Sequence, residues 1–180
     1  NHNLKTPCAD GTIIAVIEDF AQRYSYLAIA GMNYFMFVPR KWVIPPYTLN
    51  TLVYSNMLIR TFAKNRAGQV YRNVTFFNDD TDLCLRILKD GWATVLFNAF
   101  LIGKEVTMSV AGGNTEVYKQ TNNRLDFAEE LQRAHPDIVK ITKKYGRWHH
   151  QVDYSGFRQQ LIRREGIEIP DQVNNFGMIL

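Results

Sequence analysis

The sequence predicts an α/β fold in which a mixed β-sheet is flanked by helices. Buried apolar segments of strand length alternate with amphipathic helical segments. Neighbouring strands in the middle of the chain can pair antiparallel, which favours a mixed sheet over a purely parallel one. The 180 residues, 46% hydrophobic and 21% charged, have the composition of a folded domain. Apolar stretches end within about ten residues, short of the roughly 20 needed to span a membrane, so we expect no membrane contact.

Three helices are predicted from amphipathic spacing and end signals. Apolar residues recur on one face from Thr12 to Tyr24, and Asp10 precedes this segment as an N-cap. A second helix follows Asn78-Asp79-Asp80 and stops at Asp90-Gly91, a glycine C-cap signal. A third helix is expected from about Arg124 to Ala134.

Strands are predicted where β-branched, apolar and aromatic residues run between turn signals. They are expected within Tyr26–Val38, Leu52–Thr61, Tyr71–Phe77 and Trp92–Ile102. Prolines 39, 45 and 46 mark a loop, because proline cannot donate a hydrogen bond to a β-ladder. Residues 109–123, with two adjacent glycines, are predicted to be an exposed, mobile loop.

Burial is predicted from residue type. We expect the aromatic stripe Phe35, Phe37, Phe97 and Phe100 to lie in the core. We expect His2 and His135 to lie on the surface.

Two cysteines, Cys8 and Cys84, are too few for a disulfide framework and indicate a reducing compartment, so a cytoplasmic location is expected. The first residue is Asn1, and the residues after it lack the features of a signal peptide. We therefore expect that sequence upstream of Asn1 is missing.

We expect a single domain over residues 1–180, with a core sheet up to about residue 120 and basic helices and a tail from about residue 121. The net charge of +4 is concentrated in that last part. Its basic residues between positions 138 and 164 are Lys140, Lys143, Lys144, Arg147, Arg158, Arg163 and Arg164. Aromatic residues lie among them, a mixture suited to phosphate contacts beside stacking platforms. We expect one basic surface; the alternative is an ordinary solvated face whose aromatic rings point inward.

The segment Asn78-Asp79-Asp80-Thr81-Asp82 places three carboxylates where a strand runs into a helix. Ligands of open α/β sheets bind outside the carboxyl ends of strands, so this turn is the expected chemical centre. A single aspartate there is also explained as a helix cap, which stabilises by about 0.3 to 1 kcal/mol through the helix dipole. Three carboxylates repel one another, so we expect a cation or a basic substrate group beside them.

The residues around this turn resemble one family. Tyr71–Gly91, together with Ala30–Phe35, Gly112–Glu116 and Gly146–His150, resembles the TET/JBP-associated glycosyltransferase domain, and the likeness runs from about Ala28 to Phe157. Members occur in phages, in neighbourhoods that suggest sugar transfer to hydroxymethylated pyrimidines, such as 5-hydroxymethylcytosine, in DNA. The resemblance implies a GT-A-like fold, with a nucleotide-sugar-binding half followed by an acceptor-binding half, and the host cytoplasm as location.

The resemblance also implies roles. A carboxylate at the start of the helix would be the catalytic base, which by position is Asp80, and Asp79 would be a helper or a ligand. A single base predicts inversion at the sugar carbon. The donor is expected to be a UDP-sugar, with Mn²⁺ or Mg²⁺ neutralising its diphosphate. The family's metal-binding acidic pair is expected upstream of Asn1, so part of the nucleotide-binding half is expected to be missing.

Further candidates are indicated by side-chain chemistry. The candidate diphosphate contacts are Gly112, Gly113, Asn114, Lys119 and Arg147. The candidate DNA contacts are Trp148, Lys143, Lys144 and Arg86. His149 or His150 would complete the metal shell, as a C-terminal histidine does in similar enzymes. Adjacent strand residues alternate faces, so at most one of the two points into a site.

Two other functions stay open. A metal-dependent nuclease could use the acidic cluster, although the usual carboxylate-x-Lys partner is missing, since Glu116 and Lys119 are separated by two residues. A non-catalytic nucleic-acid-binding module would explain the basic tail and leave the clustered aspartates unexplained.

Overall fold

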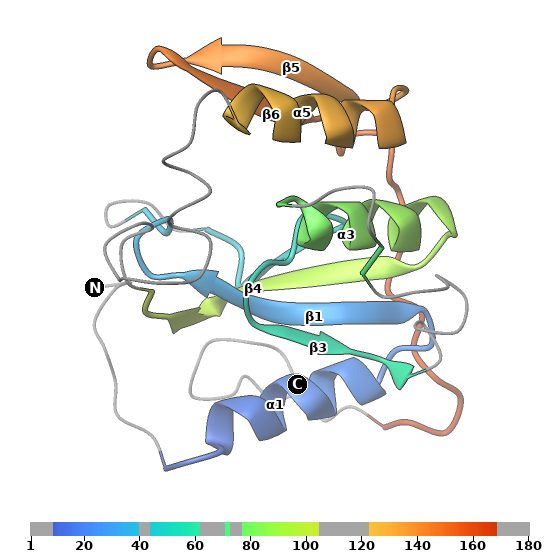
Figure 1. The fold of residues 1–180 in the computed structure, drawn as a ribbon. Helices are drawn as coiled ribbons and strands as arrows, with labels where there is room; N and C mark the ends of the chain where they lie inside the picture. Colours follow the sequence, from blue (N-terminus) through green and yellow to red (C-terminus); the bar gives the residue numbers. More distant parts are fainter. Residues whose placement is uncertain (1–8, 40–43, 62–70, 73–76, 105–122, 169–180) are drawn as a thin grey trace.

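The centre of the fold is a four-stranded mixed sheet of order β2-β4-β1-β3 (Figure 1). The computed structural model describes residues 9–39, 44–61, 71–72, 77–104 and 123–168. The strands of the sheet are β1 (Leu27–Tyr34), β2 (Tyr47–Leu49), β3 (Met57–Ile59) and β4 (Ala93–Ile102). β1 pairs in parallel with β4 and antiparallel with β3, and β2 pairs antiparallel with β4. The predicted mixed sheet is confirmed.

Two helices cover opposite faces of this sheet (Figure 1). α1 (Thr12–Gln22) buries Phe20 against Phe97 of β4, with the two rings edge to face. α3 (Asp79–Lys89) packs its apolar side, which includes Cys84, on the other face. Because β1 and β4 are covered on both faces, their sequences are continuously apolar rather than alternating.

The ends of the helices are set by local sequence, with one correction. Gly11, with φ of 79°, is the N-cap of α1, whereas Asp10 was expected to be, and no side chain caps this end. α3 stops where predicted, because Gly91 adopts φ of 84°.

A second layer lies beyond α3 (Figure 1). It consists of α5 (Asn123–Ala134) and a two-stranded hairpin, β5 (Val139–Lys144) and β6 (Arg147–Val152). The hairpin turns at Tyr145-Gly146, both with positive φ, as a two-residue turn between antiparallel strands requires. Leu131 of α5 packs between Leu85 of α3 and Val139 of β5. The region was predicted to be helices and a tail; α5 is confirmed, and the basic stretch after it forms the hairpin.

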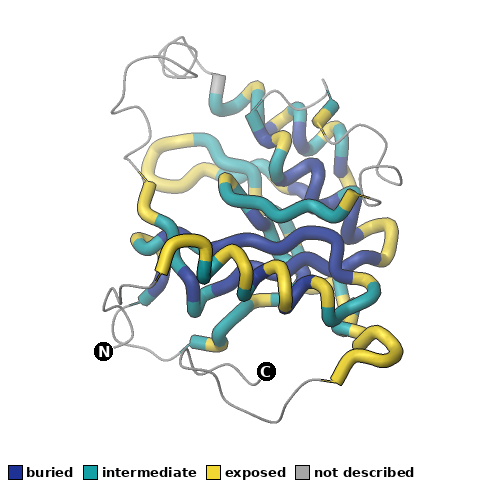
Figure 2. The backbone as a smooth tube through the Cα atoms, turned by 90° about the horizontal axis from the view of Figure 1, so that it is seen from below, coloured by how far each residue is buried: buried dark blue, intermediate teal, exposed yellow. Residues whose placement is uncertain are grey.

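The burial pattern confirms part of the predicted core (Figure 2). Phe97 and Phe100 are fully buried, whereas Phe35 is only half-buried and Phe37 is 60% exposed, because both follow the end of β1. His135 was expected on the surface and is 2% exposed. His2 lies outside the described residues.

Other expectations are met in part. The strand expected within residues 52–61 shortens to β3, and most of the strand expected at residues 71–77 lies outside the described residues. Cys84 is a buried free thiol, while Cys8 lies outside the described residues. No helix in the described ranges is both long and apolar enough to cross a membrane.

The predicted single basic surface is wrong. Arg163 forms a β-bridge with Tyr24, and the amide of Arg164 donates to the carbonyl of Arg23, so both arginines lie beside the end of α1. The hairpin that carries Lys143 lies on the opposite side of the sheet, beyond α3 (Figure 1). The chain crosses between these two places after β6, which divides the basic residues between distant surfaces.

Candidate functional site

The acidic turn lies at the carboxyl end of the parallel strands. α3 leads through Gly91 into the start of β4, so the N-terminus of α3 lies where β1 and β4 end (Figure 1). Asp79 and Asp80 occupy the first positions of α3. The turn therefore lies where α/β sheets bind ligands.

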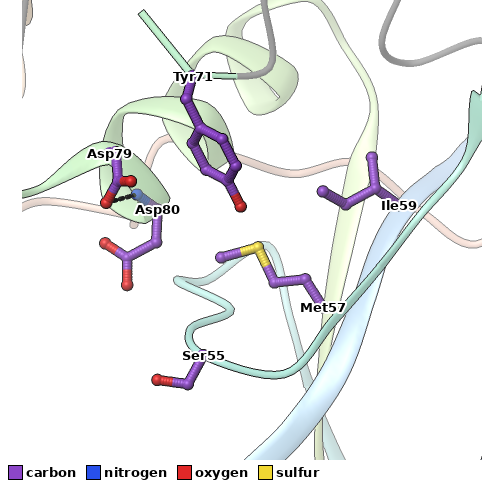
Figure 3. A pocket seen from close by; sticks show the side chains of 6 residues that line it. All are labelled: Ser55, Met57, Ile59, Tyr71, Asp79 and Asp80. Carbon is purple, nitrogen blue, oxygen red and sulfur yellow. Dashed lines mark hydrogen bonds between the residues drawn. The ribbon is translucent and has the colours of Figure 1, made fainter. Parts of the chain in front are cut away.

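A cavity of about 340 Å³ opens beside these two aspartates. The residues that line it are Ser55, Met57, Ile59, Tyr71, Asp79 and Asp80. Figure 3 shows the side chains of Asp80, Tyr71 and Ser55 around this space, with the Tyr71 hydroxyl directed inward. The volume lies within the range of small-ligand sites. We call this the acidic cavity.

Asp80 combines partial burial with local hydrogen bonds. Its Oδ1 accepts hydrogen bonds from the Thr81 amide at 2.7 Å and the Thr81 hydroxyl at 3.3 Å. Its Oδ2 has no hydrogen-bond partner within the part of the chain that the structure describes. Burial raises the pKa of Asp80 and the charge of Asp79 raises it further, against the lowering effect of Thr81. A raised pKa makes the carboxylate a better proton acceptor.

Asp79 is exposed, and its Oδ1 accepts a hydrogen bond from the Asp80 amide at 3.0 Å (Figure 3). Both aspartates therefore bond a helix amide, as first-turn acids do. Neither aspartate is the N-cap of α3, which is Asn78 and makes no side-chain capping hydrogen bond, so capping does not explain the pair. Their place in the first turn still suits the helix dipole.

Asp82 is different, because it points into the interior and is 1% exposed. Arg72 donates to it from Nε at 2.9 Å and from a terminal nitrogen at 2.6 Å, and Arg86 donates from Nε at 2.9 Å. His135 Nε2 lies 2.8 Å from its Oδ1. Burial by itself would raise the pKa of Asp82, but the hydrogen bonds from His135 and Arg72 and the charge of Arg86 hold it well below its usual range.

This arrangement changes the expectation that three carboxylates repel one another. Two arginines compensate Asp82, so only Asp79 and Asp80 share uncompensated negative charge among the described contacts. Arg86 was expected to contact DNA; its side chain is 13% exposed and is held against Asp82, away from an accessible surface.

Tyr71 and Ser55 line the acidic cavity and were not predicted as site residues. Tyr71 is 53% exposed, and burial together with the charges of Asp79 and Asp80 raises its pKa. Tyr71 begins the stretch that carries the family resemblance, which was an available signal. Nothing in the sequence around Ser55 indicates its position.

A close backbone contact holds Ser55 in place. Gly31 of β1 lies so near the loop before β3 that an added Cβ would be 2.1 Å from the Asn56 carbonyl oxygen and 2.5 Å from Val53 Cγ1. The Tyr34 hydroxyl hydrogen-bonds the Ser55 hydroxyl. The end of β1 therefore fixes one wall of the cavity.

A second cavity, of about 130 Å³, borders the residues that directly precede α3. Its lining comes from the residues before α3, from α5 and from β6, and includes Phe77, Asn78, Arg124, Phe127, Trp148, His149 and His150. Phe77 and Asn78 directly precede the two aspartates of the acidic cavity. The structure thus brings three predicted residues, Trp148, His149 and His150, to the acidic turn. We call this the aromatic cavity.

The other predicted contacts fall into two groups. On the hairpin, Lys143 Nζ lies 5.2 Å from the centre of the Trp148 ring, and Lys144 and Arg147 face each other at the exposed end. Gly112, Gly113, Asn114 and Lys119, with the predicted mobile loop, lie outside the described residues. They stay predictions.

The described ranges contain no group of three or more histidine, cysteine, aspartate or glutamate side chains that could hold a metal ion. The metal stays a prediction from the sequence.

A family model matches the N-terminal part of the chain. The family model described as TET-Associated Glycosyltransferase matches residues 1–113. This match includes β1, the acidic turn and β4, and ends before α5 and the hairpin, whereas the resemblance in the sequence extends to Phe157. No curated protein and no solved structure gives a significant match.

Proposed function

Because the chain belongs to the TET-associated glycosyltransferase family, we propose that it transfers a sugar from a UDP-sugar to the hydroxymethyl group of a modified pyrimidine in DNA. The family supports the reaction class. The acidic cavity is the observation that supports a chemical centre in this chain, because it places a half-buried carboxylate with a raised pKa in a space of ligand size.

We propose a GT-A-like arrangement of the substrates. The mixed sheet, with an acidic turn at the carboxyl end of its parallel strands, supports binding of a nucleotide-sugar at that end. The lining of the acidic cavity has hydroxyl and carboxylate groups and no basic residue among those described, which suits an uncharged sugar better than a diphosphate.

The proposed reaction has one proton transfer. The acceptor oxygen forms a bond to the anomeric carbon, while the bond from that carbon to the diphosphate breaks and its electron pair leaves with UDP. The proton of the acceptor hydroxyl goes to the Asp80 carboxylate. Tyr71, at the mouth of the same cavity, would hydrogen-bond a sugar hydroxyl through its phenol group. A single attack from the face opposite the leaving group gives inversion.

The test is transfer into DNA. The protein is incubated with a panel of UDP-sugars and duplex DNA that contains 5-hydroxymethylcytosine, with Mn²⁺ added, and the nucleosides are analysed by mass spectrometry. We expect a nucleoside heavier by one sugar, and none from matched DNA that contains unmodified cytosine.

The same assay separates the rival functions. Strand cleavage that needs the added metal, without sugar transfer, would support a nuclease and overturn the proposal. DNA binding without either reaction would support a non-catalytic module.

A further inference from the structure

The aromatic cavity differs in chemistry from the acidic cavity. Phe77 and Phe127 form a stacked wall, with ring centres 4.1 Å apart and planes inclined at 36°, and Trp148 borders the same space. Arg124 also lines it, and none of the described lining residues is acidic. Flat aromatic rings with a nearby guanidinium are the combination that binds planar bases by stacking and cation–π contact.

The hairpin register explains how these groups come together. Val139 pairs with Val152, Ile141 with His150, and Lys143 with Trp148, and directly paired residues point to the same face. Val139 is buried against Leu131 of α5, so this is the face that packs on α5. The folding of the hairpin onto α5 therefore places Trp148 and His150 at the cavity.

The size of the cavity limits its occupant. A space of about 130 Å³ is well below the roughly 300 to 1,000 Å³ of sites that hold whole small ligands. It can take one ring, while a whole nucleotide-sugar does not fit. His150, half-buried at the wall, can donate one hydrogen bond and accept another when neutral.

Positive charge next to the aromatic cavity indicates which kind of molecule carries the ring that binds there. The Lys143 ammonium lies over the Trp148 ring, and Lys144 and Arg147 are exposed at the end of the same hairpin. A base that belongs to a nucleic acid strand carries phosphates on both sides, which would lie along these cations.

We propose that the aromatic cavity binds one unstacked nucleobase of the acceptor DNA strand, between Trp148 and the Phe77–Phe127 pair, with His150 at its edge. This inference rests on the proposed function for the identity of the strand as acceptor DNA. Phe77 and Asn78 line the aromatic cavity, and Asp79 and Asp80, which follow them in the chain, line the acidic cavity, so a strand held in one cavity would be close in sequence and space to the proposed proton acceptor.

The test is binding of a short single-stranded oligodeoxynucleotide to the full protein, measured by fluorescence anisotropy. Base stacking on an aromatic side chain contributes enough that Trp148→Leu is expected to weaken binding about 5- to 150-fold. Trp148→Phe keeps a flat ring and is expected to retain most of the affinity. This second variant separates loss of stacking from loss of folding, which circular dichroism also checks.

The matched control is Tyr145→Asn. Tyr145 is an aromatic residue at the tip of the same hairpin, fully exposed and outside the cavity, and asparagine tolerates its positive φ. We expect little change in affinity. A large loss in this variant with normal binding by Trp148→Leu would place the strand at the tip and overturn the inference.

The donor nucleotide also carries a base, so binding of UDP tests whether the aromatic cavity holds the donor instead of DNA. If Trp148→Leu weakens binding of UDP while binding of the oligonucleotide is unchanged, the cavity holds the donor and the assignment to DNA is wrong. The binding result is independent of catalysis, so absence of sugar transfer with DNA binding that depends on Trp148 would refute the proposed function alone.

Discussion

Replacing Asp82 by asparagine tests most sharply whether Asp82, unlike Asp79 and Asp80, has a structural role as a buried ion-pair partner. The substitution keeps the shape of the side chain and removes its charge. Whichever oxygen is replaced, the new amide N–H group would face a donor of Arg72, together with Arg86 at the Oδ2 position or His135 at the Oδ1 position. Two guanidinium groups would then lose their counter-charge in a mostly buried place.

The size of the effect can be worked from the contacts. Asp82 takes part in four hydrogen bonds, two with Arg72 and one each with Arg86 and His135. Bonds to charged groups contribute about 1.5 to 3 kcal/mol each, but a simple sum is too large because burying the charges has its own cost. Removal of one partner of a buried ion pair lowers the free energy of unfolding by about 3 to 5 kcal/mol. For a chain of this length that corresponds to a midpoint about 6 to 20 °C lower.

The assay is urea unfolding followed by circular dichroism, with Asp79→Asn as control. Asp79 is exposed, so its substitution is expected to change the free energy of unfolding by no more than about 0.5 kcal/mol. Because the folded pKa of Asp82 lies below its ordinary value, its stabilising effect is present above that ordinary value and is lost as the pH falls through the folded pKa. If the two variants unfold alike at pH 7, the buried network around Asp82 does not exist as described.

Two further predictions concern stability. Asp80→Asn should raise the free energy of unfolding at pH 7. The folded pKa of Asp80 is raised, so its charged carboxylate destabilises the fold above that pKa. In urea titrations the gain in the free energy of unfolding should therefore shrink as the pH falls. Gly31→Ala should lower the free energy of unfolding by about 1 to 3 kcal/mol, because its added Cβ overpacks against Asn56 and Val53. The control Gly103→Ala, whose added Cβ has no atom within 4 Å, should leave the free energy of unfolding nearly unchanged. Equal effects of the two substitutions would contradict the close approach at Gly31.

The sequence was sufficient for elements whose signal is local. The apolar run of β4, the amphipathic α3 and the glycine that ends it each have a pattern within a few residues. α3 begins at the predicted acidic segment because a helix start is a local feature, whereas most of the strand expected before it lies outside the described residues. The hairpin was missed because Tyr145-Gly146 is a weak turn signal beside Asn-Gly or Asp-Gly, although the positive φ of both residues makes the same turn.

The chemistry of the site depends on contacts between distant residues. Asp79 and Asp82 look equivalent in the sequence, and only the folded chain brings His135, 53 positions from Asp82, to bond one of them. The same packing buries His135, against the expectation that it lies on the surface. The aromatic cavity joins Phe77 to Trp148 through the packing of the hairpin on α5, which no local pattern could indicate.

The central claim is that Asp80 accepts the proton of the acceptor hydroxyl, and single-turnover sugar transfer by Asp80→Asn measures it most directly. The substitution preserves shape and removes basicity, so turnover should fall by about 10² to 10⁴ while the affinity for the UDP-sugar, measured by calorimetry, changes little. Asp90→Asn, at the exposed far end of the same helix, should react at the normal rate. Near-normal turnover by Asp80→Asn would contradict the claim and remove Asp80 from the mechanism.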